Sequence, residues 1–178
     1  MALGGGVTTS TASDERLAQF AIQIRYEFAW HLAVNFFGTH GVTQAFLPLL
    51  VRSQGAIVNV LSLAALASVP FSPVYAISKA AAFSMTQSLR ALWAGRGVNV
   101  HAVFAGPVDT DMTGSLDIPK TPPESVAHGV FEGVEKGEED IIPDPMSEGI
   151  AEGWRTGVAK ALERQFAAYT PESMAKVA

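Results

Sequence analysis

Three short runs of strand-forming residues, each separated from the next by a stretch long enough for a helix, constrain the fold of this chain most strongly. They cover residues 56–61, 98–104 and 140–142. The first is almost wholly apolar, which is typical of a strand buried on both faces of a parallel sheet. Parallel strands need crossover connections, which helices commonly provide. The sequence therefore predicts an α/β fold of about three parallel strands with flanking helices, corresponding to part of a doubly wound sheet.

Helix signals precede the first of these strands. Residues 11–14 form a capping-box pattern, which predicts a helix through about residue 28. A long apolar helix is expected over residues 31–50. It carries Asn35, and Pro48 marks its last turn.

The helix after the first strand has the clearest start signal. Ser72 provides an N-cap and Pro73 an N1 proline, so this helix is expected to begin just before Tyr75. Gly95 or Gly97 is expected to end it. The remaining expected elements are a loop over residues 105–120, a helix from a second capping-box pattern at 121–124 to 136–137, and a final polar helix over 146–169.

The composition predicts one globular domain and excludes several classes of function. With 178 residues and 48% hydrophobic content, residues 14–178 can form a single core, preceded by a flexible tract at 1–13. The net charge of −5 argues against nucleic-acid binding. The absence of cysteine fits the cytoplasm, and the longest apolar stretch is too short and interrupted to span a membrane. The four histidines lack metal-ligand spacing, so we expect no metal site.

Tyr75 and Lys79 form the most informative pair for chemistry. Four positions apart, they project from one face of a helix. An ammonium beside a phenol stabilises the phenolate, which lowers the tyrosine pKa and makes it a usable acid–base group. Ser62 follows the first predicted strand, which delivers its hydroxyl to the end of the sheet. An isolated pair with this spacing also occurs as an ordinary surface tyrosine and lysine, so the surrounding residues decide the interpretation.

Five segments occur in a fixed order along the chain. They are VNFFG at 34–38, GAIVNVLS at 55–62, YAISKAA at 75–81, GVNVH at 97–101 and GPVDTDM at 106–112. With these motifs the chain resembles the short-chain dehydrogenase/reductase family, strongly over about residues 30–145 and weakly at the flanks. Five ordered motifs are far more specific than any one of them.

The resemblance implies a partial Rossmann-like fold and an NAD(P)-dependent oxidoreductase acting on a carbonyl or secondary alcohol of a small molecule. It gives Tyr75 the exchange of a proton with the substrate oxygen. It gives Lys79 both the lowering of the Tyr75 pKa and a hydrogen bond to the nicotinamide ribose. Ser62 orients the substrate, and Asn35 holds a water that links Lys79 to solvent. Taken without the resemblance, Asn35 is equally well a polar residue at a helix bend, and Ser62 a plain hydroxyl at a strand end.

The resemblance also implies a nicotinamide-contacting loop. Its matching residues are Gly106, Pro107, Val108 and Thr110. The family prefers proline immediately before this glycine, and here the residue is Ala105. Alanine leaves the turn more conformational freedom, which adds an entropic cost to ordering the loop.

The phosphate-binding glycine loop of the family is the main departure. The glycines at residues 4–6 follow no strand-length apolar run, so they cannot form the first strand–helix turn of a dinucleotide site. They resemble a remnant of the family's later Asn-Asn-Ala-Gly segment. We therefore expect NAD or NADP binding to be weak or absent. The alternative function is a truncated, non-catalytic fragment that self-associates; the sequence identifies neither the substrate nor the preferred dinucleotide.

Two surfaces are expected to mediate homo-oligomer formation. One is the apolar face of the Asn35 and Tyr75 helices, which pair across a dimer in many family members. The other is the edge of the strand at residues 57–61, which lacks its expected neighbour. The acidic residues between 132 and 140 are expected to form a solvated face.

Overall fold

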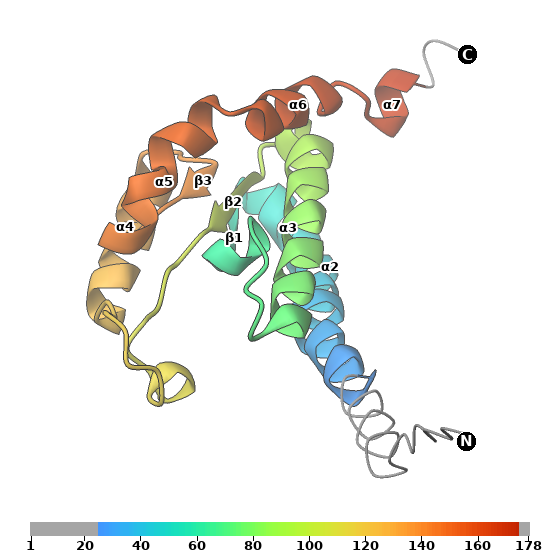
Figure 1. Cartoon of the computed structure of the whole chain (residues 1–178). Helices are drawn as coiled ribbons and strands as arrows, with labels where there is room; N and C mark the ends of the chain where they lie inside the picture. Colours follow the sequence, from blue (N-terminus) through green and yellow to red (C-terminus); the bar gives the residue numbers. More distant parts are fainter. Residues whose placement is uncertain (1–24, 175–178) are drawn as a thin grey trace, which may run out of the picture.

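The computed structural model describes residues 25–174 and contains one parallel sheet (Figure 1). Its strands are β1 (Ala56–Val60), β2 (Asn99–Val103) and β3 (Asp140–Ile141), in the order β1-β2-β3. Both strand pairs are parallel. The predicted α/β class and all three strands are thus confirmed. The flexible tract at 1–13 and the first capping-box pattern lie outside the described residues.

Helices lie on both sides of the sheet. In Figure 1, α2 (Thr39–Ser53) and α3 (Pro73–Trp93) lie to one side of the strands and α4 (Pro123–Glu135) to the other. Helix α3 packs across β2, and α4 packs on β3. The chain then continues as α5 (Pro145–Thr156), α6 (Val158–Phe166) and the short α7 (Pro171–Met174). No helix among residues 25–174 is long and apolar enough to cross a membrane.

The main core lies between α3 and β2. Phe83 packs edge-on against Phe104, with ring centroids 4.9 Å apart. Trp154 of α5 closes this cluster against both rings, each 5.7 Å away. On the opposite face, α4 approaches β3 so closely that a Cβ at Gly133 would lie 2.7 Å from Ile141 side-chain atoms. This contact requires glycine at that position.

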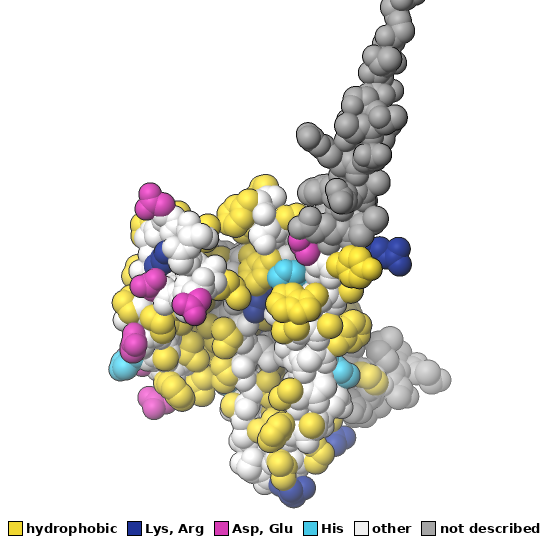
Figure 2. Space-filling view, turned by 90° about the horizontal axis from the view of Figure 1, so that it is seen from below, with side chains coloured by type: hydrophobic (Ala, Val, Ile, Leu, Met, Phe, Trp, Pro, Cys, Tyr) yellow, Lys and Arg dark blue, Asp and Glu magenta, His cyan; other side chains and the backbone are white. Residues whose placement is uncertain are grey.

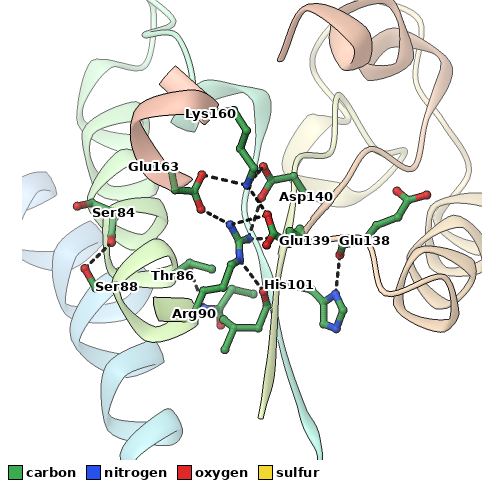
Figure 3. Close-up of polar contacts among 12 residues, drawn as sticks. Ser84, Thr86, Ser88, Arg90, His101, Glu138, Glu139, Asp140, Lys160 and Glu163 are labelled. Carbon is green, nitrogen blue, oxygen red and sulfur yellow. Dashed lines mark hydrogen bonds and ion pairs between the residues drawn. The ribbon is translucent and has the colours of Figure 1, made fainter. Parts of the chain in front are cut away.

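A buried cluster of charges ties α6 to the sheet (Figure 3). Arg90 of α3 and Lys160 of α6 both contact the Asp140 carboxylate of β3, at 2.8 Å and 2.7 Å. Both cations also pair with Glu163. Burial by itself raises the pKa of Asp140, but Arg90 and Lys160 outweigh it and hold the pKa below its usual value. The expected solvated acidic face is therefore wrong for Asp140, because two distant cations converge on it.

Two helix predictions need correction before the first strand. No break separates residue 28 from residue 31: the chain is helical from residue 25, continues as the π-helical segment η1 (Ala33–Gly38) and then becomes α2. Pro48 lies inside α2, which runs on to Ser53. Gln54 ends this helix in a left-handed conformation, with φ of 50°.

Two further corrections concern helix termini. Thr121 is not the cap of α4; Pro122 occupies that position, and Thr121 instead forms a bridge with Val108. The predicted final helix is broken at Gly157, whose extended backbone separates α5 from α6. By contrast, α3 begins at the expected proline, although the Ser72 side chain makes no capping hydrogen bond.

The edge of β1 away from β2 is open. The Leu61 N–H donates to the Val103 carbonyl, and the Asn99 N–H donates to the Gly55 carbonyl. Backbone groups of successive residues in a strand point to opposite sides. Since Gly55 and Leu61 face β2, the backbone groups of Val58 and Val60 face away from it. The part of the chain that the structure describes supplies no strand there.

Candidate functional site at the carboxyl ends of β1 and β2

Tyr75 and Ser62 lie together where β1 ends. Ser62 follows the strand and caps a short 3₁₀ helix by accepting a hydrogen bond from Ala64 N–H at 3.1 Å. Tyr75 lies in the first turn of α3. Burial raises the pKa of Tyr75, and a hydrogen bond with the Ser62 side chain lowers it by less. The two hydroxyls that sequence reasoning singled out are thus brought within reach of each other.

Lys79 is close to Tyr75 but is engaged elsewhere. Its Nζ donates to the Val60 carbonyl at 3.0 Å and lies 5.7 Å from the centroid of the Tyr75 ring. Burial lowers the pKa of Lys79. The expected lowering of the Tyr75 pKa by this ammonium is therefore wrong for the described structure, where the net shift is upward. The pKa is raised because burial of the phenol outweighs its hydrogen bond with Ser62, while the Lys79 ammonium donates to the Val60 carbonyl.

Asn35 reaches the same helix through an intermediary. It lies in the π-helical segment η1, and its Nδ2 donates to Ser78 Oγ at 2.9 Å. Ser78 Oγ in turn donates to the Tyr75 carbonyl at 2.7 Å. π-Helical turns often mark functional positions, because the extra residue redirects a side chain or a carbonyl. Here Asn35 fixes the first turn of α3, and sequence reasoning missed Ser78 as the link.

The loop after β2 is held at several points. The Thr121 N–H donates to the Pro107 carbonyl, and the Asp109 N–H donates to the Thr121 carbonyl, both at 2.9 Å. The Thr113 hydroxyl donates to the Val108 carbonyl. These bonds give the predicted nicotinamide-contacting residues a defined backbone, with Gly106 through Val108 half-buried and Thr110 exposed.

Asp144 also contacts this loop and was missed. Its Oδ2 accepts a hydrogen bond from the Gly106 N–H at 2.8 Å. The available signal was the sequence Asp144-Pro145, the same cap-and-proline pattern that located the start of the Tyr75 helix.

A groove of about 650 Å³ adjoins the Asn35 and Lys79 side of the site. It runs between α2 and the open edge of β1 and is lined mainly by apolar side chains. In Figure 2, which looks at the molecule from below, hydrophobic side chains are spread widely over the face shown. The site is therefore bounded by a well-packed loop on one side and by an open apolar groove on the other.

The overall arrangement is typical of a ligand site in an α/β protein. Such proteins bind ligands in the crevice outside the carboxyl ends of their parallel strands. Ser62 follows β1 and Gly106 follows the adjacent β2, so they lie at the same end of the sheet. Among residues 25–174, no group of three histidine, aspartate or glutamate side chains could hold a metal ion.

Comparison with known sequences gives the family. The profile described as "short chain dehydrogenase" matches residues 7–120, which is more than half of the chain. The protein belongs to the short-chain dehydrogenase family. Mouse estradiol 17-beta-dehydrogenase 2 is 42% identical over 87 residues, covering 49% of this chain and 23% of the relative. Oxidoreductase UcpA of Salmonella typhimurium is 35% identical over 124 residues, covering 67% of this chain and 47% of the relative.

Solved structures agree with this assignment. A short-chain dehydrogenase from Burkholderia cenocepacia J2315 in complex with NADP superposes with a TM-score of 0.66 at 35% identity, covering 79% of this chain and 58% of that one. A short-chain dehydrogenase from Sphingobium yanoikuyae in complex with NADPH gives a TM-score of 0.61 at 23% identity, which shows the fold alone. The chain spans less than half the length of the two sequence relatives and about 58% of the first structure.

Proposed function

We propose that this dehydrogenase-family chain is an NAD(P)-dependent oxidoreductase that interconverts a small-molecule carbonyl and its secondary alcohol. The observation that carries the proposal is the convergence of Ser62, Tyr75 and Lys79 at the carboxyl end of β1, beside the anchored loop that follows β2. A hydroxyl pair next to a lysine supplies acid–base chemistry, and the loop supplies backbone groups for a carboxamide.

The residues present fit the nicotinamide end of the cofactor. The loop offers half-buried backbone at Gly106 through Val108 and an exposed hydroxyl at Thr110, and such groups can hydrogen-bond a carboxamide. Gly106 itself packs closely against the start of α5, where a Cβ would lie only 2.8 Å from Asp144 Oδ1. Gly106 through Val108 and the Thr110 hydroxyl would hold the carboxamide, and Lys79 would hold the ribose. When bound, the cofactor supplies or accepts a hydride. We further propose that the affinity of this chain for the dinucleotide is weak, since the described residues offer no glycine-rich turn that opens a helix for the pyrophosphate.

Within this scheme the side chains have separate tasks. Tyr75 Oη donates a proton to the substrate oxygen during carbonyl reduction and takes it back during alcohol oxidation. Ser62 hydrogen-bonds the same oxygen and orients it. Asn35, through Ser78, holds the turn from which Tyr75 projects. Burial raises the pKa of Tyr75, so the phenol is protonated at neutral pH, which is the form that donates a proton in carbonyl reduction.

The direct test is NADH- or NADPH-dependent reduction of a panel of ketones that includes a 17-keto steroid, chosen because of the estradiol dehydrogenase relative. We expect Tyr75→Phe to eliminate measurable turnover. Tyr169→Phe serves as the control, because this tyrosine is 62% exposed and lies beyond α6. Turnover retained by Tyr75→Phe contradicts the proposed role of the phenol.

One set of observations favours the second candidate, a non-catalytic module that self-associates. Lys79 is bound to the Val60 carbonyl, and the edge of β1 and the adjoining groove are open. Calorimetric titration with NADH and NADPH separates the candidates. A dissociation constant in the millimolar range, about −4 kcal/mol, together with slow but measurable turnover supports a weakly binding enzyme. No binding and no turnover support the module.

A further inference from the structure

The carboxylate of Asp144 joins two segments that are distant in the sequence. Asp144 follows β3, is 4% exposed and occupies the N-cap of α5. Its Oδ1 accepts a hydrogen bond from the Ser147 N–H at 3.1 Å, which is the ordinary bond of a helix cap. Its Oδ2 accepts hydrogen bonds from Ser147 Oγ at 2.6 Å and from the Gly106 N–H at 2.8 Å.

The hydrogen bond from the Gly106 N–H to Asp144 is not needed to cap α5. A single side-chain oxygen satisfies the first turn of α5, and a serine or threonine can provide it. The second carboxylate oxygen reaches the loop that follows the neighbouring strand, where a hydrogen bond to a charged acceptor is stronger than one to a neutral acceptor. Asp144 therefore acts on the loop as well as on its own helix.

The position of this bond is informative because Gly106 is the residue at which the loop leaves the sheet: the Leu63 N–H holds the Ala105 carbonyl at 3.1 Å, and the Asp144 side chain holds the next N–H. Ala105 precedes Gly106, and alanine leaves the backbone more freedom than proline does. Downstream, Thr121 already holds the loop through Pro107 and Asp109. The Asp144 bond is thus the side-chain anchor on the upstream end of the segment, and the two anchors together bracket residues 107–109.

We propose that Asp144 is a positioning residue for the nicotinamide end of the cofactor site, and that its bond to Gly106 replaces the restraint that a proline at position 105 provides. This inference rests on the proposed function. It makes α5 part of the cofactor site, because the helix and the loop share one buried carboxylate. Its consequence is that loss of the bond weakens binding at the nicotinamide end without removing the cap of α5.

The test compares two variants that separate the two bonds. Asp144→Ser keeps a capping oxygen but is too short to reach Gly106, whereas Ser147→Ala keeps the carboxylate and its bond to the loop. The probe is reduced nicotinamide mononucleotide, which carries no adenine half. We expect its dissociation constant to rise about tenfold in Asp144→Ser and less than about twofold in Ser147→Ala. Adding Ala105→Pro to Asp144→Ser is expected to recover most of the affinity.

Amide hydrogen exchange gives a second readout that does not depend on cofactor binding. If Asp144 orders the loop, exchange of the Asp109 N–H accelerates in Asp144→Ser and slows again when Ala105→Pro is added. Unchanged exchange and an unchanged dissociation constant overturn the inference. Failure of the unsubstituted chain to bind the mononucleotide overturns the proposed function and the cofactor role of Asp144 with it, while exchange at Asp109 still decides whether Asp144 orders the loop.

Discussion

The two edges of the sheet, here called the β3 margin and the β1 margin, differ in how far their side chains are buried and paired. At the β3 margin, Asp140 and Lys160 have side chains only 3% exposed, and their charges are balanced within the cluster. At the β1 margin, Val60 is 61% exposed and Phe46 of the adjacent α2 is 56% exposed. One margin carries a buried ion cluster that joins α3, β3 and α6, and the other presents an open strand edge and apolar side chains.

The candidate site has one half near each margin, and the two halves differ in the same way. Its loop half belongs to the closed side, where Asp144 and Thr121 fix the backbone. Its acid–base half belongs to the open side, where Lys79 is bound to an edge carbonyl. The comparison teaches that the loop half, to which we assign the nicotinamide, is held in place by its own chain, whereas one of the three N–H donors of the Lys79 ammonium is occupied by an edge carbonyl.

The largest expected effect is loss of stability at the closed margin. Lys160→Met removes a buried cation and leaves Asp140 and Glu163 with Arg90 as their remaining buried cationic partner. Breaking a buried ion pair in this way costs about 3–5 kcal/mol. The free energy of unfolding in urea measures it. Lys136→Met is the matched control, because that exposed side chain pairs only with Glu132 among its recorded ion pairs, and such a pair is worth at most about 1 kcal/mol.

Acid is expected to open the same margin. The folded pKa of Asp140 is below its unfolded value, so its contribution to stability is complete above about pH 4 and is lost as the pH falls through the folded pKa. Urea unfolding followed from pH 6 downward tests this sign. In Asp140→Asn the decline should be shallower; an equally steep decline assigns the acid sensitivity to other carboxylates.

A smaller effect is expected at the open margin, where we propose that copies of the chain pair. Val60→Lys places a charge on the edge of β1 and should raise the dissociation constant of the oligomer about tenfold. Phe131→Lys is the control, since Phe131 is 71% exposed but lies on α4 of the closed side. Light scattering over a concentration series measures both. A monomeric parent chain at high micromolar concentration contradicts the open-edge interpretation.

The smallest effect concerns the ionisation of Tyr75. Because its folded pKa is raised, the protonated form is favoured in the folded state, and the associated stability is present below about pH 10 and lost as the pH rises through the folded pKa. The phenolate absorbance of the parent minus that of Tyr75→Phe should therefore titrate above pH 10. A midpoint below 10 contradicts the upward shift that burial of the phenol produces.

Much of the fold could be predicted from local patterns. The first two strands are valine-rich runs of strand length, and α3 begins at the expected proline. The wrong predictions concern features that are set by contacts between residues distant in the sequence. The chain passes from residue 28 to residue 31 without a break, which the local signals do not reveal. Thr121 forms a bridge with Val108 instead of capping α4. Among the acidic residues near position 140, Asp140 is buried and pairs with two cations.

The candidate site was predictable in its residue types and less so in its contacts. Tyr75 and Ser62 come together where a strand ends and a helix begins, and Asn35 reaches the Tyr75 turn only through Ser78. The direction of the Tyr75 pKa shift was not predictable, since it depends on how far the fold buries the phenol and on its hydrogen bond with Ser62. Asp144 was visible as a cap but not as a loop anchor.

The sequence by itself determined the alternation of strands and helices, the start of α3 and the placing of Tyr75 and Lys79 on one face of its first turns. These follow from periodicity and from backbone preferences that act over a few residues. Only the tertiary structure decided that Lys79 satisfies Val60 and that Asp144 holds Gly106. Both depend on which backbone groups the packing leaves without partners, because buried polar groups must find partners wherever the fold brings them.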